Sequence, residues 1–320
     1  MNRPDVLVVG AGVSGLTTSL RLAEHGVRVR IRAQDAPADT NSAAAGAIWD
    51  PIYAEHPRVP EWAQRSYEVF TRMVADGFPG VRLVDGVEAD RLPITSPEWA
   101  RGLPGFRECD PGDLPPGFVH GWHYTAPIID MPPYLAALEA MVRAYGADLH
   151  FGRRLTSLAE GFADAPIVVN CSGPGARELV PDPTVRPIRG QLVAIRNPGH
   201  REFFAEHTEE LGEMIYLLPQ GDMLLLGGSA EEGIDDPAPD PLVADAIVKR
   251  CGDIFPEIRH AEILENRGGI RPARAMIRLE HEDLGDRHIV HNYGHSGAGV
   301  SLSWGCADDV AAIVGRLLGR

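Results

Sequence analysis

The stretch DVLVVGAGVSGLTTSLRLAEHGVRVRIRA, residues 5–33, carries the strongest signal of fold in the sequence. Its opening apolar run predicts a buried parallel strand, the helical spacing that follows predicts a helix, and the alternation over 27–33 predicts a second strand. Between the first strand and the helix, Gly10, Gly12 and Gly15 form the pattern GxGxxG. In such a unit the glycines permit a tight turn, a close approach to a pyrophosphate, and close packing of helix on strand. We therefore expect a dinucleotide at the N-terminus of this helix.

The end of the second strand leaves the choice of dinucleotide open. An acidic residue that binds the ribose is expected there. This sequence instead has Ala33 and Gln34, with Asp35 one position later. Arg30 and Arg32 keep NADP as an alternative, because arginine can bind its 2′-phosphate, although strand arginines more often form a solvated face.

A second glycine-rich loop precedes a helix at the other end of the chain, in HNYGHSGAGVSLSWGCADDVAAIVGRLL, residues 291–318. Apolar residues spaced three and four positions apart from 300 to 318 predict an amphipathic helix. Two loop-to-helix junctions suit one extended cofactor with two centres of negative charge, and FAD fits this description. Its pyrophosphate would lie at the first helix, and its flavin ring, which gains negative charge on reduction, at the second. The glycines between 294 and 299 would let the main chain approach the ring.

Patterns typical of α/β proteins at both ends of the chain enclose a β-rich middle. Helices are expected over 61–77, 132–147 and 241–256, and strands within 148–158, 167–173, 186–230 and 288–294, whereas 81–130 is broken by Pro and Gly into short β-like pieces. The predicted fold class is α/β, with a Rossmann-type FAD-binding domain assembled from discontinuous segments and an α+β substrate-binding domain whose sheet is mostly antiparallel. The expected boundaries are 1–60, 131–185 and 265–320 for the FAD-binding domain, and 61–130 and 186–264 for the substrate-binding domain.

Composition excludes several classes of partner. The formal net charge of −15 over 320 residues argues against nucleic acid and against an anionic membrane surface. No apolar run is long enough for a transmembrane helix, and the N-terminus does not read as a signal peptide, so a cytoplasmic protein is expected. The four cysteines form no CxxC pair and no Cys/His spacing suits zinc, so no metal is expected. The oligomeric state is expected to be monomer or homodimer.

Seven motifs follow one another along the chain: VVGAGVSGL (8–16), AAGAIW (44–49), GWHYT (121–125), VNCSG (169–173), RGQ (189–191), GGIRPAR (268–274) and HNYGHSGAGVSLSWGCA (291–307). In these motifs, and in their order, the sequence resembles the D-amino-acid oxidase family, flavoproteins related to D-aspartate oxidase and more distantly to glycine oxidase. The last motif is the most specific of the seven.

The resemblance implies an FAD-dependent oxidase of neutral D-amino acids. A hydride would pass from the α-carbon to flavin N5, the imino acid would hydrolyse to a 2-oxo acid and ammonia, and dioxygen would reoxidise the flavin to give hydrogen peroxide. The alternative within this chemistry is a D-aspartate oxidase or glycine oxidase with a different side-chain pocket. A non-catalytic FAD-binding or sensor protein and an NADP-dependent reductase are alternatives from other classes.

Three site residues follow from the resemblance. Arg271 matches the family's carboxylate-binding arginine, whose planar guanidinium suits a bidentate contact. Tyr216 matches a tyrosine whose hydroxyl also reaches the substrate carboxylate. Gly297 matches the glycine whose carbonyl accepts a hydrogen bond from the substrate amine. These three anchors, together with the flavin plane, would enforce chirality without a side-chain base.

The resemblance and the two glycine loops together imply a longer set of FAD-binding residues. The expected set is Gly10, Gly12, Val13, Ser14, Gly15, Ala33, Gln34, Asn41, Ser42, Ala45, Gly46, Leu155, Ser172, Gly173, Gly269, Arg271, His295, Ser296, Gly297, Ala298, Gly299, Val300 and Ser301. His295 is expected to be a structural or flavin-bonding residue and no base, and Ser301 to cap the last helix and contact the flavin.

The sequence departs from the family pattern near the substrate. Gly212 stands where some relatives carry a second tyrosine, so no aromatic lid is expected there. Asp50, if it faces the pocket, would disfavour acidic substrates. An acid-selective relative would need an extra pocket cation, for which Arg201 and His207 are the candidates.

Overall fold

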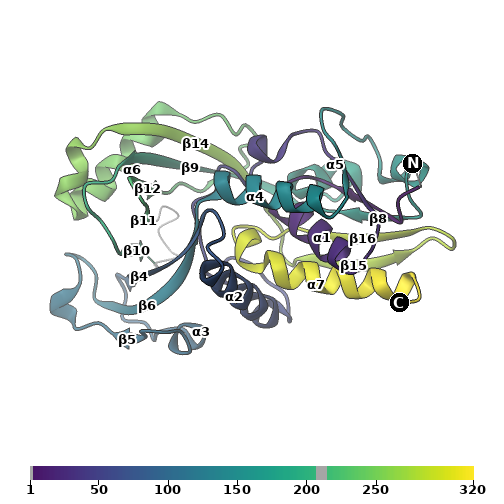
Figure 1. Cartoon of the computed structure of the whole chain (residues 1–320). Coiled ribbons are helices and arrows are strands. Elements are labelled where there is room, and N and C mark those ends of the chain that lie inside the picture. The colour runs from purple at the N-terminus through teal and green to yellow at the C-terminus, as the bar shows by residue number, and fades with distance from the viewer. Residues whose placement is uncertain (1–2, 207–214) are drawn as a thin grey trace.

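Two β-sheets with helices packed around them make up the protein, as the computed structural model shows (Figure 1). The structure describes residues 3–206 and 215–320. The expectations for Gly212 and His207 fall on the segment 207–214, which lies outside the described residues.

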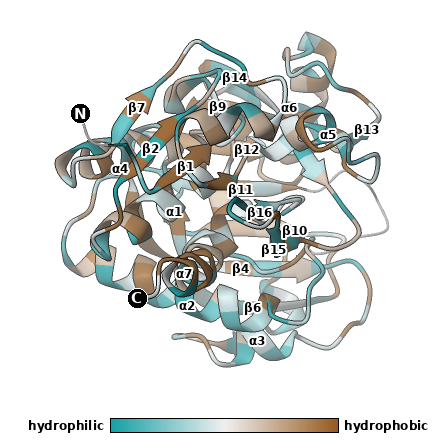
Figure 2. Cartoon of the chain, turned by 90° about the vertical axis from the view of Figure 1, so that its right-hand side faces the viewer, coloured by the Kyte–Doolittle hydropathy of each residue, from teal (hydrophilic) through white to brown (hydrophobic). Residues whose placement is uncertain are grey.

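The first sheet has six strands in the order β15-β16-β8-β1-β2-β7, and all its pairings are parallel except that of β15 with β16. All four residues of β1 are buried, as expected for a parallel strand covered on both faces. Figure 2 shows the hydrophobic colouring on β1 inside the molecule and hydrophilic colouring on outer loops. The strands are β1 (Val6–Val9), β2 (Val29–Arg32), β7 (Asp148–His150), β8 (Ile167–Asn170), β15 (Arg278–Asp283) and β16 (His288–Tyr293).

The second sheet has ten strands, mostly antiparallel, in the order β13-β9-β12-β11-β10-β4-β6-β3, with β14 paired to β9 and β5 to β6. The pairing of β10 with β4 is parallel. Its strands are β3 (Ala47–Ile48), β4 (Val81–Asp90), β5 (Arg107–Glu108), β6 (His120–Ile129), β9 (Arg186–Arg196), β10 (Phe203–Glu206), β11 (Tyr216–Gln220), β12 (Met223–Gly227), β13 (Glu231–Glu232) and β14 (Ile263–Ala273).

Helix α7 at the C-terminus packs against both α1 and α2, and α4 packs against α1 (Figure 1). The α1–α7 contact brings the helices of the two glycine loops together, although they lie at opposite ends of the sequence. The helices are α1 (Val13–Glu24), α2 (Val59–Ala75), α3 (Glu98–Arg101), α4 (Met131–Ala144), α5 (Ala176–Leu179), α6 (Pro241–Ile254) and α7 (Gly299–Leu317).

Two expectations about strands are wrong. The region 81–130 contains two ten-residue strands, β4 and β6, that pair antiparallel along their whole length. Gly86 interrupts the alternation in the sequence, but the strand continues through it. Glycine is needed here because the ring of Phe203 packs against the backbone, and an added Cβ would lie 2.4 Å from that ring. Conversely, 148–158 forms only the three residues of β7, since glycine and arginines then lead into a loop.

Sheet membership crosses the expected domain division in two places. Segments 1–60 and 265–320 were expected in the FAD-binding domain, whereas β3 pairs with β6, and β14 pairs with β9 up to Ala273, both in the ten-stranded sheet. The boundaries therefore stay a proposal, with 265–273 better grouped with the second sheet.

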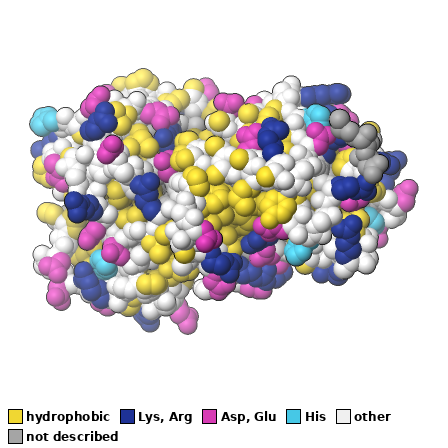
Figure 3. All heavy atoms as spheres, viewed as in Figure 1, with side chains coloured by type: hydrophobic (Ala, Val, Ile, Leu, Met, Phe, Trp, Pro, Cys, Tyr) yellow, Lys and Arg dark blue, Asp and Glu magenta, His cyan; other side chains and the backbone are white. Residues whose placement is uncertain are grey.

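The surface carries both signs of charge. On the face shown in Figure 3, basic and acidic side chains are interspersed around an apolar area. Among the described residues, no helix combines the length and the hydrophobicity needed to cross a bilayer. All four cysteines are free.

Candidate active site

A cavity of about 820 Å³ lies between the two sheets. Residues that directly follow β1, β2 and β8 line it, namely Gly10, Ala33 and Cys171. The cavity is therefore at the carboxyl ends of the parallel strands, where open α/β sheets bind ligands. Its opposite wall is the inner face of the ten-stranded sheet, including Arg271 and Tyr216.

The first glycine loop is shaped by backbone contacts that exclude side chains. Gly10 has φ +112°, and an added Cβ would lie 2.3 Å from the carbonyl oxygen of Cys171. An added Cβ at Gly15 would lie 2.1 Å from the carbonyl oxygen of Gly10. Gly15 does not line the cavity, so its role is the close packing of α1 on β1. Gly12 and Val13 line the cavity where the helix begins.

Neither helix that starts at the cavity is capped by the side chain of the residue before it. Gly12 precedes α1 and Ala298 precedes α7; neither provides a capping hydrogen bond, and neither helix has an acidic residue in its first turn. Two positively polarised helix N-termini thus meet one cavity. This arrangement suits a long ligand with negative charge at two places.

The expectation that Ser301 caps α7 is wrong. Ser301 lies inside the first turn, where its hydroxyl accepts a hydrogen bond from the backbone N–H of Asp50 at 3.0 Å and donates to the carbonyl of Ile48 at 3.4 Å. It therefore fastens the segment after β3 to the start of α7, while still lining the cavity.

Asn41 and Ser42 fasten the loop after β2 to other parts of the cavity wall. The Ser42 hydroxyl accepts a hydrogen bond from the N–H of Val13 at 3.0 Å, and the Asn41 side-chain carbonyl accepts one from the N–H of Ile270 at 2.7 Å. The second bond joins this loop to the strand that carries Arg271.

Most residues expected to bind the cofactor do line the cavity. Gly15 and Ala298 do not line it, and Ala298 is buried. All the other residues of the expected set do: Gly10, Gly12, Val13, Ser14, Ala33, Gln34, Asn41, Ser42, Ala45, Gly46, Leu155, Ser172, Gly173, Gly269, Arg271, His295, Ser296, Gly297, Gly299, Val300 and Ser301.

Arg271 lies in β14 against the neighbouring strand β9. An added Cβ at Gly190 would lie 2.5 Å from the guanidinium carbon, so only glycine leaves room for this arginine. Its Nη1 donates to the carbonyl oxygen of Ser229 at 2.9 Å. Over residues 3–206 and 215–320, no carboxylate forms an ion pair with Arg271. A cavity-lining arginine held by a neutral carbonyl is suited to bind an anionic ligand.

Tyr216 begins β11 and lies over the glycines that end β12. An added Cβ at Gly227 would lie 2.3 Å from the Tyr216 hydroxyl oxygen. Burial raises the pKa of the Tyr216 hydroxyl, while the charge of Arg271 acts in the opposite direction. The hydroxyl is therefore a neutral hydrogen-bond donor at neutral pH.

Residues 5–313 match the family described as "FAD dependent oxidoreductase". The chain belongs to this family. The D-amino-acid oxidase of Rubrobacter xylanophilus is 45% identical over 316 residues, with 98% of this chain and 96% of the relative covered. That of Streptomyces coelicolor is also 45% identical, over 313 residues, with 97% and 96% covered.

Solved structures of flavoprotein oxidases share the fold of this oxidoreductase. Glycine oxidase from Geobacillus kaustophilus matches with a TM-score of 0.84 at 22% identity, covering 99% of this chain and 95% of that one. Glycine oxidase from Bacillus cereus matches with a TM-score of 0.84 at 18% identity, covering 98% and 96%. The mixed α/β architecture with two sheets is thus that of FAD-dependent oxidases, and FAD is the cofactor.

The family's cofactor suits the cavity of this oxidoreductase. The cavity extends from the N-terminus of α1 to that of α7, and both ends present backbone N–H groups and glycines to a ligand. Gly12 and Gly297 expose main chain to the cavity with no Cβ in the way.

His295 in this oxidoreductase is neutral at physiological pH. It is buried, and burial lowers its pKa to about 4. Its Nε2 lies 3.0 Å from the side-chain carbonyl of Asn292, whose amide nitrogen donates to Thr18. Nε2 therefore carries the proton, and Nδ1 is an acceptor. This agrees with a positioning role.

The strand arginines that kept NADP as an alternative are paired with carboxylates. Arg30 contacts Asp148 and Asp164 at 2.8 Å each, and Arg32 contacts Asp164 at 2.9 Å. They are thus neutralised by the protein and do not form a cation pair for a 2′-phosphate.

Part of the cavity wall on the ten-stranded sheet was not predicted from the sequence. Glu88, Leu192, Ala205 and Leu218 line the cavity, and Glu88 is 1% exposed. These residues can be identified only when the register of the paired strands is known, because the register decides which alternate side chains face the cavity. Asp50 does line the cavity, whereas Arg201 is exposed and does not.

Proposed function

We propose that this oxidoreductase is a D-amino-acid oxidase that converts D-amino acids, uncharged ones among them, together with dioxygen and water, to 2-oxo acids, ammonia and hydrogen peroxide. The observation that supports this most directly is Arg271, a cavity arginine that donates a hydrogen bond to a carbonyl group of the protein. The two D-amino-acid oxidases at 45% identity support the same substrate class.

In this proposal Arg271 and Tyr216 bind the substrate carboxylate. The guanidinium offers two parallel N–H donors, and the neutral tyrosine hydroxyl offers a third hydrogen bond. The pKa of the hydroxyl is raised by burial, so it remains a donor throughout the neutral range. Together they fix the carboxylate against the ten-stranded sheet.

Gly297 would accept a hydrogen bond from the substrate amine through its carbonyl. It lies in the loop before α7, and an added Cβ would be 3.5 Å from Tyr53, another cavity residue. A carboxylate anchor on one wall and an amine anchor on the other allow only one enantiomer to present its α-hydrogen to the cofactor.

The residues proposed to hold FAD are those of the two loops and the strand ends that line the cavity. When bound, FAD supplies the acceptor for the substrate's two electrons and passes them to dioxygen. The protein positions the substrate and, through His295 and Asn292, holds the α7 loop in place. The discontinuous domains, a cytoplasmic location and a monomeric or dimeric state are further parts of the proposal.

A stereochemical substrate screen tests this function. D- and L-isomers of the common amino acids would be offered to the holoenzyme, with hydrogen peroxide as the readout. We expect activity with D-isomers such as D-alanine and D-methionine and none with their L-isomers. Activity confined to glycine would instead favour the glycine oxidases that share the fold. The absence of peroxide with every D-isomer would contradict the proposal.

A further inference from the structure

One row of residues crosses five strands on the cavity face of the ten-stranded sheet. The register aligns Leu192 with Gly227, Gly227 with Tyr216, Tyr216 with Ala205, and Ala205 with Glu88. Directly paired residues carry their side chains on the same face. Glu88 is therefore on the face that carries Tyr216, two strands away.

The row indicates in which direction a substrate side chain would extend and how long a side chain would fit. With the carboxylate fixed at Tyr216, the side chain can extend across Ala205, whose methyl group leaves space, toward Glu88. Two strand spacings amount to about 10 Å, a distance suited to a long side chain together with the reach of the glutamate. All three residues line the cavity.

Glu88 is held in a fixed position. The hydroxyl of Tyr124 donates to its Oε2 at 2.9 Å, and both residues are buried. Tyr124 is in turn packed edge-on against Trp99 and Phe203, at ring centroid distances of 5.8 and 5.2 Å. A buried carboxylate in such a place favours a cationic or hydrogen-bond-donating neighbour.

A second acidic residue, Asp50, also lines the cavity. The two ends of the row differ in the side chains that they offer a substrate, because the guanidinium of Arg271 stands at the carboxylate end and the carboxyl group of Glu88 lies two strands beyond Tyr216.

We propose that Glu88 selects D-amino acids whose long side chain ends in a cation, an ammonium or a guanidinium, and rejects side chains that end in a carboxylate. This goes beyond the expectation of neutral substrates and rests on the proposed function. D-arginine and D-lysine are the probes of the cationic class, D-methionine is a neutral substrate of similar length, and D-glutamate is the acidic counterpart.

The experiment compares kcat/KM for these four compounds in the wild type, Glu88→Gln and Asp85→Asn. Glutamine keeps the size of Glu88 and can accept the hydrogen bond from Tyr124. Asp85 is the matched control, since it is an exposed carboxylate on the same strand that does not line the cavity.

In the wild type we expect kcat/KM for D-arginine to exceed that for D-glutamate by at least about 100-fold, because a buried attraction between opposite charges is replaced by a repulsion between like charges. In Glu88→Gln, the D-arginine value should fall about tenfold or more relative to D-methionine, while D-glutamate gains. Asp85→Asn should keep the wild-type ratios. Using D-methionine as the internal reference removes any general loss of folding or FAD binding.

An unchanged ratio of D-arginine to D-methionine in Glu88→Gln would overturn this inference while leaving the proposed function intact. Wild-type activity on D-glutamate equal to that on D-arginine would overturn it without any variant. Loss of activity toward D-methionine itself in the wild type would mean that the proposed function fails.

Discussion

At the scale of single residues, the site depends on a few side chains whose positions are set by glycines on neighbouring strands. Arg271 fits only because Gly190 has no side chain, and Tyr216 fits only because Gly227 has none. The ladder of β14, β9, β12 and β11 brings these pairs together. The glycines thus determine where the substrate carboxylate can bind.

Replacing Arg271 should therefore impair substrate binding far more than folding. We expect Arg271→Ala to lower kcat/KM for D-methionine at least about 100-fold, since a lost bidentate charge-assisted pair costs roughly 3 kcal/mol. Arg271→Lys should recover only part of this loss, because an ammonium lacks the planar fork. Steady-state kinetics on FAD-loaded enzyme measures both.

Arg196→Ala is the control for this prediction. Arg196 is an exposed arginine on β9 that pairs with Glu262 and does not line the cavity. Its kinetics should match the wild type. A KM that stays at the wild-type value in Arg271→Ala would place the carboxylate anchor elsewhere.

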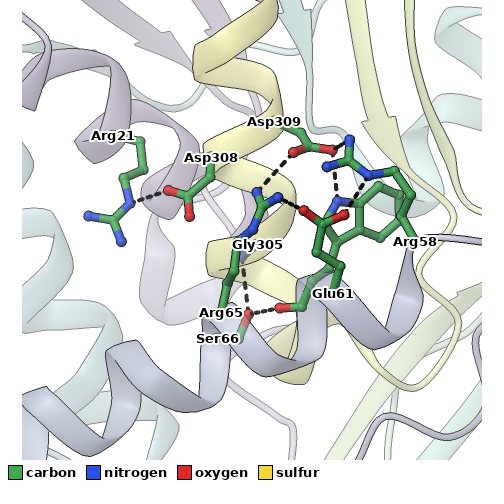
Figure 4. Close-up of polar contacts among 9 residues, drawn as sticks. Arg21, Arg58, Glu61, Arg65, Ser66, Gly305, Asp308 and Asp309 are labelled. Atoms are coloured by element: carbon green, nitrogen blue, oxygen red, sulfur yellow. Dashed lines mark hydrogen bonds and ion pairs between the residues drawn. The ribbon is translucent and has the colours of Figure 1, made fainter.

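At the scale of elements, α7 is fixed to α1 and α2 by both close packing and charge (Figure 4). Arg21 of α1 pairs with Asp308 at 2.7 Å, and Arg65 of α2 pairs with Asp309 at 3.0 Å. The indole N–H of Trp62 also donates to Asp309, at 2.8 Å. These contacts hold the N-terminus of α7 at the cavity.

Gly305 allows α7 and α2 to approach closely, and this can be tested within one helix. An added Cβ at Gly305 would lie 2.3 Å from the backbone of Trp62, whereas one at Gly315 would meet nothing closer than 3.7 Å. Gly305→Ala should therefore destabilise the protein by about 1–3 kcal/mol, as overpacking does. Gly315→Ala should be neutral or stabilise by up to about 1 kcal/mol, because alanine favours a helix.

Urea unfolding of the two variants measures the difference. Equal effects of both alanines would show that helix propensity, and not close packing of α2, governs this region. The test needs no assumption about substrate or cofactor.

The elements also show what the sequence could reveal. The glycine loops and their helices were predictable, because local patterns encode them, whereas Arg271 was predicted only from the resemblance to a family. The strands β4 and β6 were not, since Gly86 and its neighbours break the alternation for a reason that lies in Phe203, more than a hundred positions away. Glu88 was missed for the same cause: its place in the cavity follows from the register of β4 with β10.

At the scale of the whole molecule, the cavity requires the two sheets to keep a fixed relation. Asp182 joins them. It accepts hydrogen bonds from Tyr293, at the end of β16 in the six-stranded sheet, at 2.7 Å, and from Arg274, next to β14 of the ten-stranded sheet, at 3.1 Å. A third bond comes from the backbone of Thr184 at 3.0 Å.

These contacts make the stability of the protein depend on pH in a definite direction. Burial alone would raise the pKa of Asp182, but the hydrogen bonds from Thr184, Tyr293 and Arg274 together lower it well below its usual value. A carboxyl whose pKa is depressed in the folded state stabilises the protein above the pKa of the unfolded chain, about 3.8. That contribution is lost as the pH falls below this value.

Asp182→Asn removes the charge and should therefore lower the melting temperature. The decrease should be constant between about pH 5 and 7, because this range begins about one unit above the ordinary pKa of an aspartate. The difference in melting temperature between wild type and variant should narrow as the pH falls through about 4 toward 3. Asp182 of the unfolded wild-type chain is then protonated, whereas the folded carboxylate, with its lowered pKa, stays ionised, so folding must release a proton and the stabilisation shrinks. Thermal melts at saturating FAD would measure it, with Asp85→Asn as an exposed control. A gap that stays constant to pH 3, or widens there, would show that Asp182 joins the sheets by shape alone and that its ionised form contributes nothing.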